Sequence, residues 1–169
     1  YYPFDNGTSE DAFGSNDGTS YRESNATKSL QVVAGKDGGD AIELNPATGA
    51  DYVALPSNAT SEIAGSGSRT ICVWARVENW TEWAVVFKYG GRADDTGEFS
   101  LFLGYEEGEL TVNTGGDNET VIAINGTVDW DSWHHYCVTY DNATGVATTT
   151  NATNATGVAL YFDGQMAAS

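Results

Sequence analysis

Basic residues, proline and long apolar runs are scarce in this 169-residue chain, and each scarcity excludes a class of protein. Seven Lys and Arg stand against 24 Asp and Glu, which gives a net charge of −17. Such a surface repels phosphate backbones and anionic lipid, so we expect no nucleic-acid partner. No apolar run approaches the roughly 20 residues of a membrane-spanning helix, so we expect no membrane insertion. The chain also lacks an initiator Met and a signal peptide, which favours a mature or excised piece of a longer protein.

The residues that are present favour a folded all-β protein. The chain is 40% apolar and 12% aromatic, which argues against disorder throughout. Twenty glycines and three prolines favour short strands joined by turns, and no stretch shows a sustained helical period. The length suits a single domain over residues 1–169. We therefore predict an antiparallel β-sandwich.

Strand-like patterns occur at regular spacing after a polar opening segment, residues 1–29, which we expect to be a loop. The most regular stretch is 133–141, where Tyr136, Val138 and Tyr140 fall on one face and His135, Cys137 and Thr139 on the other. The other predicted strands are 30–33, 41–44, 51–55, 70–77, 84–89, 99–105, 109–113, 121–124 and 158–163, the last entering an Asp163-Gly164 turn.

The chain has only two cysteines, and both lie in strand-like runs. Cys72 belongs to the run 70–77 and Cys137 to the run 133–141. We expect these strands to be neighbours joined by a Cys72–Cys137 disulfide. Closing a loop of roughly 65 residues is worth about 4 kcal/mol in chain-entropy estimates. Two cysteines placed mid-strand also fit an oxidising compartment.

Asparagine is used in an unusual way. Nine of the twelve asparagines begin an Asn-x-Ser/Thr sequon, whereas 31 Ser and Thr in 169 residues (12 × 31/169) would place about two there by chance. We therefore predict a secreted or cell-surface N-glycoprotein, with an acidic bacterial surface protein as the alternative. Asn151 and Asn154 are the strongest candidates for glycosylation, and Asn79 is weaker because bulky Trp80 follows it. The nine sites are Asn6, Asn25, Asn58, Asn79, Asn118, Asn125, Asn142, Asn151 and Asn154.

A short duplication lies between the last two predicted strands. The sequence Asn-Ala-Thr-Gly-Val-Ala occurs at 142–147 and again at 154–159. We interpret residues of about 142–157 as a glycan-rich hairpin insertion.

The ordered set of motifs resembles laminin-G-like domains of the concanavalin A-like jelly-roll superfamily. The cysteines resemble the pentraxin branch, in which a Thr-x-Cys strand is bridged to a His-x-Cys strand. The resemblance implies a jelly-roll β-sandwich that normally continues past the Asp-Gly turn. We therefore expect the domain to be partial at its C-terminus, lacking its closing strands and leaving an edge beside Tyr1–Asp5. The motifs are Tyr2-Pro3-Phe4-Asp5, Asn16-Asp17-Gly18, Asp51-Tyr52-Val53 with Leu55-Pro56, Ile71 with Trp74-Ala75, Trp133-His134-His135 with Thr139-Tyr140-Asp141, and Leu160-Tyr161-Phe162-Asp163-Gly164.

The resemblance also suggests a calcium site. Asp94 and Asp95 lie on a Gly-flanked loop and resemble a calcium-ligating pair of pentraxins. Carboxylate oxygens suit calcium, but six to eight are needed. The alternative is that these are solvated turn acids of an acidic protein.

Other chemistry-bearing residues favour structural roles. His134 and His135 point to opposite faces of a strand, so they cannot chelate one metal together, and we expect packed or hydrogen-bonded rings. Glu107 and Glu109 flank a Gly-containing turn, and Asp129 and Asp131 lie in a loop beside Trp130. Neither pair sits inside a strand with a third acid in register, so we expect no enzyme. Four tryptophans could form a sugar-binding platform, although we expect Trp133 to lie in the core and Trp80 to be exposed or covered by glycan. We expect Trp74, beside Cys72, to be a core residue too. The platform candidates are Trp80, Trp83, Trp130 and Trp133.

Three functional hypotheses remain. The first expects a non-catalytic extracellular recognition or assembly module whose partners are other copies or neighbouring domains of an extracellular assembly. The second is a calcium-dependent, lectin-like module that binds glycans. The third is an accessory domain of a carbohydrate-active enzyme.

Overall fold

The computed structural model describes residues 1–22, 29–45, 51–58, 67–90, 99–113, 119–124, 128–141 and 157–168. The chain divides into two compact units, Tyr1–Glu62 and Ile63–Ser169, called unit 1 and unit 2 below. The single domain predicted over 1–169 stays a prediction, and the insertion predicted at about 142–157 lies outside the described residues apart from Gly157. Within the described part, no helix is long and apolar enough to cross a membrane.

Unit 1 contains two small antiparallel sheets. In the first, β1 (Thr19–Tyr21) pairs with β4 (Tyr52–Ala54), and the rings of Tyr21 and Tyr52 stack at 4.7 Å. In the second, β2 (Gln31–Ala34) pairs with β3 (Asp40–Glu43). The described part of unit 1 also contains two short 3-10 turns, η1 (Asp5–Gly7) and η2 (Lys36–Gly38). The prediction that residues 1–29 form only a loop is wrong, because β1 lies within them.

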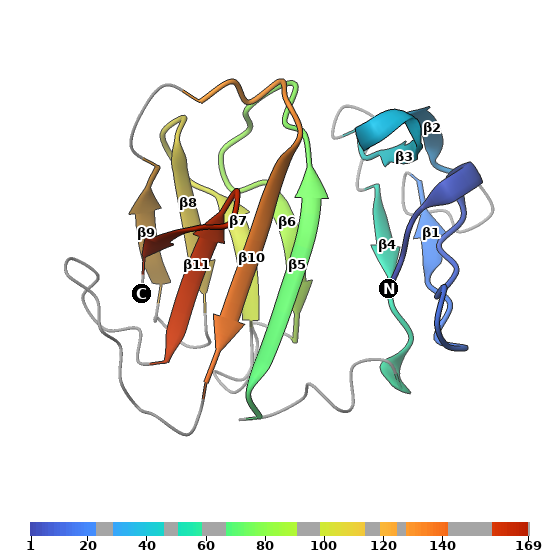
Figure 1. The fold of residues 1–169 in the computed structure, drawn as a ribbon, viewed down its shortest axis with the longest axis horizontal. Coiled ribbons are helices and arrows are strands. Elements are labelled where there is room, and N and C mark those ends of the chain that lie inside the picture. The colour runs from blue at the N-terminus through green and yellow to red at the C-terminus, as the bar shows by residue number, and fades with distance from the viewer. Residues whose placement is uncertain are drawn as a thin grey trace. The chain divides into compact units, whose positions relative to one another are not determined.

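Unit 2 is an antiparallel β-sandwich, as predicted, and its two four-stranded sheets are seen in Figure 1. One sheet has the order β12-β11-β10-β5. Its members are β5 (Arg69–Ala75), β10 (His134–Tyr140), β11 (Val158–Phe162) and β12 (Gln165–Ala168). The other sheet has the order β6-β7-β8-β9. Its members are β6 (Val85–Tyr89), β7 (Phe99–Leu103), β8 (Glu109–Asn113) and β9 (Glu119–Ala123).

Alternation along β10 produces the core. Tyr136 and Val138 are fully buried, and Tyr140 is partly buried and packs against the same cluster. Apolar side chains of the facing sheet complete this core, so burial of one face of each sheet holds the two layers together. The facing core residues are Phe99, Leu101, Leu103, Leu110, Val112 and Ile122.

The chain reverses after β11 and forms a strand that the sequence pattern did not indicate. Asp163 and Gly164 both adopt positive φ in this turn, at 48° and 75°. β12 then pairs back onto β11. The predicted strand 158–163 therefore ends at Phe162, and β12 follows it.

Candidate functional site

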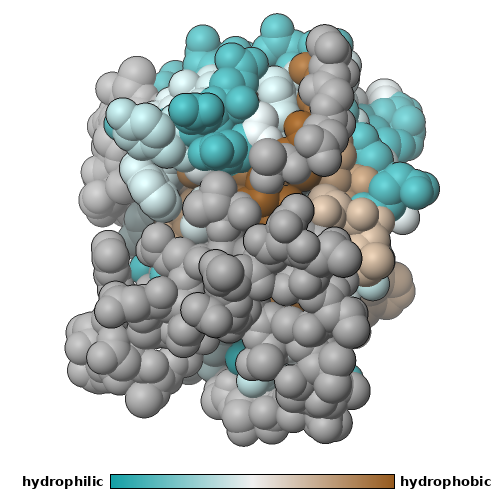
Figure 2. Space-filling view, turned by 90° about the vertical axis from the view of Figure 1, so that its left-hand side faces the viewer, coloured by the Kyte–Doolittle hydropathy of each residue, from teal (hydrophilic) through white to brown (hydrophobic). Residues whose placement is uncertain are grey.

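A pocket of about 460 Å³ opens at one end of unit 2. Figure 1 shows that three connections meet at this end: β5 to β6, β7 to β8, and β9 to β10. We call it the rim pocket. This end is at the top of Figure 1, and Figure 2 shows hydrophilic residues at the top of the view as well. The pocket is lined by Val77, Glu78, Asn79, Trp80, Glu107, Val128, Asp129, Trp130 and Asp131.

Two tryptophans hold the connections in place. The rings of Trp80 and Trp130 meet edge to face at 5.0 Å, and Trp130 is only 9% exposed. The Trp80 indole N–H donates to the carbonyl of Gly104 at 3.4 Å, which ties the β5–β6 connection to the β7–β8 turn. The Val77 amide donates to the Trp130 carbonyl at 3.0 Å. The pocket therefore has an ordered aromatic wall that does not depend on a ligand.

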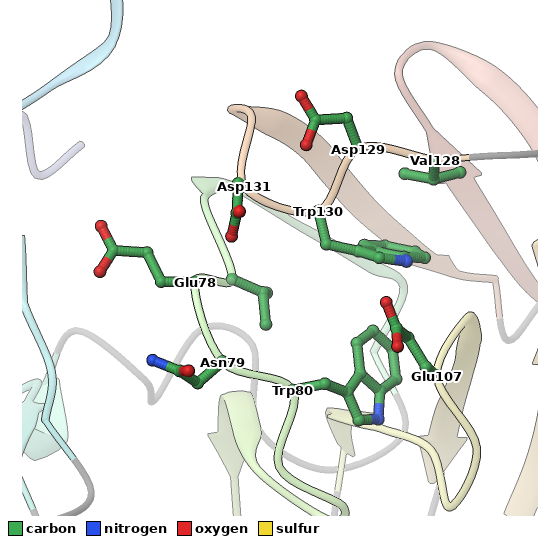
Figure 3. A pocket seen from close by; sticks show the side chains of 9 residues that line it. Glu78, Asn79, Trp80, Glu107, Val128, Asp129, Trp130 and Asp131 are labelled. Atoms are coloured by element: carbon green, nitrogen blue, oxygen red, sulfur yellow. The ribbon is translucent and has the colours of Figure 1, made fainter.

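The β7–β8 turn places Glu107 against this wall. The Gly104 amide donates to the Glu109 carbonyl, and a Cβ at Gly104 would collide with Glu109. Gly108 has a φ of 96°, a conformation that suits glycine. Figure 3 shows the Glu107 carboxylate beside the two indole rings, while the Asp129 carboxylate points away from them.

Among the described residues, four carboxylates line the pocket, and no Lys, Arg or His does. Two of them are engaged: Glu78 pairs with Arg76, and Asp129 accepts a hydrogen bond from the Ser132 hydroxyl at 2.7 Å. Glu107 and Asp131 have no hydrogen bond or ion pair within the part of the chain that the structure describes. The pocket thus offers hydrogen-bond acceptors, and its ligand must supply donors.

The structure regroups the carboxylate pairs considered in the sequence. Glu109 does not line the pocket, and its carboxylate accepts the Glu106 amide at 3.2 Å. Glu107 instead lies with Asp129 and Asp131, which come from a different connection. The proximity of residues from separate connections was not visible in the sequence. One signal was available: an acid follows a valine shortly before a tryptophan in both Val77–Trp80 and Val128–Trp130.

His134 connects the pocket residue Asp129 to the turn between β11 and β12. Its Nδ1 lies 2.7 Å from Asp163 Oδ2, and its Nε2 lies 2.8 Å from the Asp129 carbonyl oxygen. The ring also stacks on Phe162 at 4.8 Å. His135 lies on the other face, against Trp74 at 5.0 Å. The prediction of hydrogen-bonded or packed histidines is confirmed.

The Asp163 carboxylate has a lowered pKa. Partial burial acts to raise this pKa, but hydrogen bonds from the His135 amide and the His134 ring outweigh burial and lower it. The amide contact, from His135 N–H to Asp163 Oδ1, measures 2.9 Å. Asp163 is therefore held as a carboxylate.

Two tryptophans, Trp74 and Trp80, are placed differently from the expectation. Trp74 is 46% exposed on the outer face of β5, so its prediction as a core residue is wrong. Trp80 packs against the core and is partly buried, so the prediction of an exposed ring is wrong, while cover by a glycan stays a prediction. Trp83 is 46% exposed, and Trp133 lies 5.7 Å from the Arg76 guanidinium. Only Trp80 and Trp130 of the predicted platform line the pocket.

The predicted disulfide is present. Cys72 and Cys137 are directly opposite in the β5–β10 register, with a Cα separation of 4.0 Å. Their bond lies on the outer face of the sheet, because the alternating residues Tyr136 and Val138 point into the core.

The predicted glycosylation sites are described only in part. Asn6, Asn58 and Asn79 are exposed, and Asn79 lines the rim pocket. Exposure permits glycosylation but does not test it. The other six sites lie outside the described residues: Asn25, Asn118, Asn125, Asn142, Asn151 and Asn154.

The predicted calcium pair, Asp94 and Asp95, also lies outside the described residues. Among the residues that are described, no group of three or more His, Cys, Asp or Glu side chains is arranged to hold a metal ion. The calcium site stays a prediction.

Comparison with known proteins supports the fold. A family model described as the concanavalin A-like lectin/glucanases superfamily, of laminin G type, matches residues 47–169. This span includes all of unit 2 and the rim pocket. No curated protein and no solved structure gave a significant match.

Proposed function

Because the chain belongs to the concanavalin A-like lectin/glucanases superfamily, we propose that it is a non-catalytic recognition module that binds its partner through the rim pocket. Domains of this laminin G type suggest carbohydrate or protein binding. The observation that carries the proposal is the aromatic wall of Trp80 and Trp130 beside two unengaged carboxylates, Glu107 and Asp131. Concave sites with apolar walls and a few polar groups are the usual form of ligand sites.

The ligand that fits this lining is a neutral glycan. Sugar hydroxyls are hydrogen-bond donors, and carboxylates are strong acceptors for them. Acidic sugars would bring a like charge next to four carboxylates, so we expect them to be rejected.

Calorimetry with neutral and uronic-acid oligosaccharides tests this proposal. The double variant Glu107→Gln/Asp131→Asn keeps the pocket's shape and removes both free charges. A lost charged hydrogen bond costs about 1.5–3 kcal/mol, so we expect affinity to fall roughly tenfold or more. Glu106→Gln is the matched control, because Glu106 lies in the same turn and does not line the pocket. Binding of no neutral oligosaccharide, or equal effects of the two variants, would contradict the proposal.

The extracellular and glycosylated character is part of the proposal. Nine sequons and a disulfide between the only two cysteines support it. Peptide mass mapping before and after enzymatic glycan removal tests it, and unmodified asparagine at all nine sites would exclude it. Incubation of any bound oligosaccharide with the protein tests the non-catalytic role, and release of shorter products would overturn that role.

The proposed calcium ligands are Asp94 and Asp95. Calorimetry with calcium should separate the native chain from an Asp94→Ala/Asp95→Ala variant. Equal heats from both would remove this site.

A role in an extracellular assembly is the second candidate. A row of side chains crosses the outer face of the sheet from Cys72 and Cys137 to Tyr161 and Met166, as the strand register shows. Met166 is 60% exposed, and Trp74 on the same face is 46% exposed. The net charge of −17 favours a basic partner over a second copy for this face. Sedimentation of the chain with a basic partner protein, with and without Trp74→Ser, tests this role.

A further inference from the structure

The imidazole of His134 makes a contact through each of its nitrogens, and these contacts join two separate turns. Nδ1 meets Asp163 Oδ2 at 2.7 Å, in the turn between β11 and β12. Nε2 meets the Asp129 carbonyl at 2.8 Å, in the connection that precedes β10. The side chain is only 12% exposed, so water has little access to replace either contact.

Both partners are acceptors. The Asp129 carbonyl already accepts the Ser132 amide at 2.9 Å, and a carbonyl oxygen cannot donate. Asp163 accepts the His135 amide through Oδ1, and its lowered pKa keeps it ionised. Each His134 nitrogen must therefore carry a hydrogen for both contacts to be hydrogen bonds.

A neutral imidazole carries one N–H and one lone pair, whereas the imidazolium carries two N–H groups. We propose that the protonation state of His134 regulates the rim pocket: the imidazolium ties the segment 128–131 to the β11–β12 turn, and the neutral ring releases this link. The neutral ring keeps its N–H toward the Asp163 carboxylate, because the bond to an ionised acceptor is the stronger one. The contact with Asp129 is then the one that is lost.

Loss of that contact reaches the pocket directly. Asp129 and Trp130 both line it, and the Trp130 ring lies 5.9 Å from the His134 ring. The segment 128–131 would keep the Ser132 amide bond and the Val77–Trp130 bond but lose its link to the β11–β12 turn. Its ordering, and with it the placement of Asp131, should weaken when a rise in pH removes the second ring proton of His134.

Other charged and titratable groups near His134 do not replace its two contacts. The Asp163 and Asp129 groups face the ring, and Phe162 covers one side of it. The Asp129 carboxylate is directed at the Ser132 hydroxyl, so it does not replace the carbonyl contact. Tyr136 follows on the same face of β10, and its burial raises its pKa above the ordinary value, so it stays neutral. His135 lies on the opposite face and is the other histidine of the chain.

The consequence for binding rests on the proposed function, but the protonation link itself can be tested without a ligand. Hydrogen exchange by NMR should be followed on the full chain at pH 5.5 and pH 8, as protection factors of the 128–132 amides. We expect protection to fall about tenfold at the higher pH, the equivalent of one hydrogen bond of about 1.4 kcal/mol. His134→Gln should remove this pH dependence, and His135→Gln, the matched control, should keep it.

A second variant tests the same link if His134→Gln does not fold. Asp163→Asn removes the ionised acceptor, and the same loss of pH dependence is expected. Protection that is equal at both pH values in the native chain, or a dependence abolished by His135→Gln instead, would overturn the proposal. Neutral-oligosaccharide binding measured at the two pH values separates the two ideas. Binding that does not change with pH overturns regulation and leaves the proposed function standing. Absence of binding, together with pH-dependent exchange, overturns the proposed function and leaves the protonation link standing.

Discussion

Asp163 accepts hydrogen bonds through both carboxylate oxygens, and its lowered pKa makes this contribution to stability depend on pH. The stabilisation is fully present above the unfolded-state pKa of about 3.9 and is lost as pH falls through the lower folded-state pKa. We predict that Asp163→Asn lowers the free energy of unfolding by about 1 kcal/mol at pH 7, a value discounted because the side chain is 43% exposed. Asparagine tolerates the φ of 48° at this position.

Urea unfolding from pH 7 to pH 2 measures this effect. The difference between native chain and variant should shrink toward zero at the acid end. Asp131→Asn is the control, because Asp131 has no hydrogen bond or ion pair among the described residues. A difference that is constant over the whole pH range would contradict the assignment.

Trp130 and Trp74 should differ sharply in their effect on stability, in the order opposite to the one that the sequence favoured, because it placed Trp74 in the core and Trp130 on a platform. Trp130 is 9% exposed and contacts Trp80, His134 and Phe162, so Trp130→Ala should cost about 3–5 kcal/mol. Trp74→Ala removes a side chain that is 46% exposed and should cost about 1 kcal/mol or less. Chemical denaturation of both variants checks the ranking, and a larger loss at Trp74 would contradict it.

At the scale of elements, the disulfide offers a clean measurement. It joins residues separated by 65 positions in sequence, and it lies on the outer face of the β5–β10 pair. Replacement by Cys72→Ala/Cys137→Ala leaves little cavity in the core. The loss in the free energy of unfolding should therefore come mainly from the greater conformational entropy of the unfolded chain. We predict a loss of about 4 kcal/mol in the free energy of unfolding, measured in guanidinium chloride.

The single variant Cys72→Ala, compared with the reduced native chain, provides the control. The two should agree, because each lacks only the cross-link. A double variant as stable as the oxidised native chain would show that the unfolded chain gains little freedom.

The strands of unit 2 were predictable where burial alternates. β10 has Tyr136 and Val138 inside and Cys137 outside, and this period of two is visible in the sequence. β1 was not predictable, because Thr19, Ser20 and Tyr21 are too few and too polar to show a period. β12 was missed because Gln165 and Met166 follow a turn and are exposed, so they carry no apolar alternation.

The rim pocket was less predictable than the strands. Its residues come from three connections, and a single sequence does not say which connections meet at one end of a sandwich. Trp74 illustrates the same limit: its neighbours in β5 indicate a strand, but they do not say which face is covered. Only the pairing of β5 with β10 places it outside, with Cys72 and His135.

At the scale of the whole molecule, the net charge is the feature that most affects the stability of the folded chain. The net charge of −17 makes the folded chain repel itself, and dissolved salt screens this repulsion over about 10 Å at 0.1 M. We predict that raising sodium chloride from 10 to 150 mM raises the melting temperature by about 3 °C, or about 1 kcal/mol for a chain of this size. Potassium chloride at equal ionic strength is the control, since the effect belongs to ionic strength. A fall in melting temperature would mean that attractive ion pairs outweigh the repulsion.

The position of Asn79 on the rim pocket would couple glycosylation to ligand binding. Asn79 lines the pocket and begins a sequon, so a glycan attached there would be tethered at the mouth of the site. A tethered sugar has a high effective concentration and would compete with any free ligand for the Trp80 wall and the Glu107 carboxylate. Protein made without N-glycosylation and protein made with it would then behave as open and self-occupied forms of one receptor. The cell type in which the chain is produced, as well as its sequence, would decide whether the site is free.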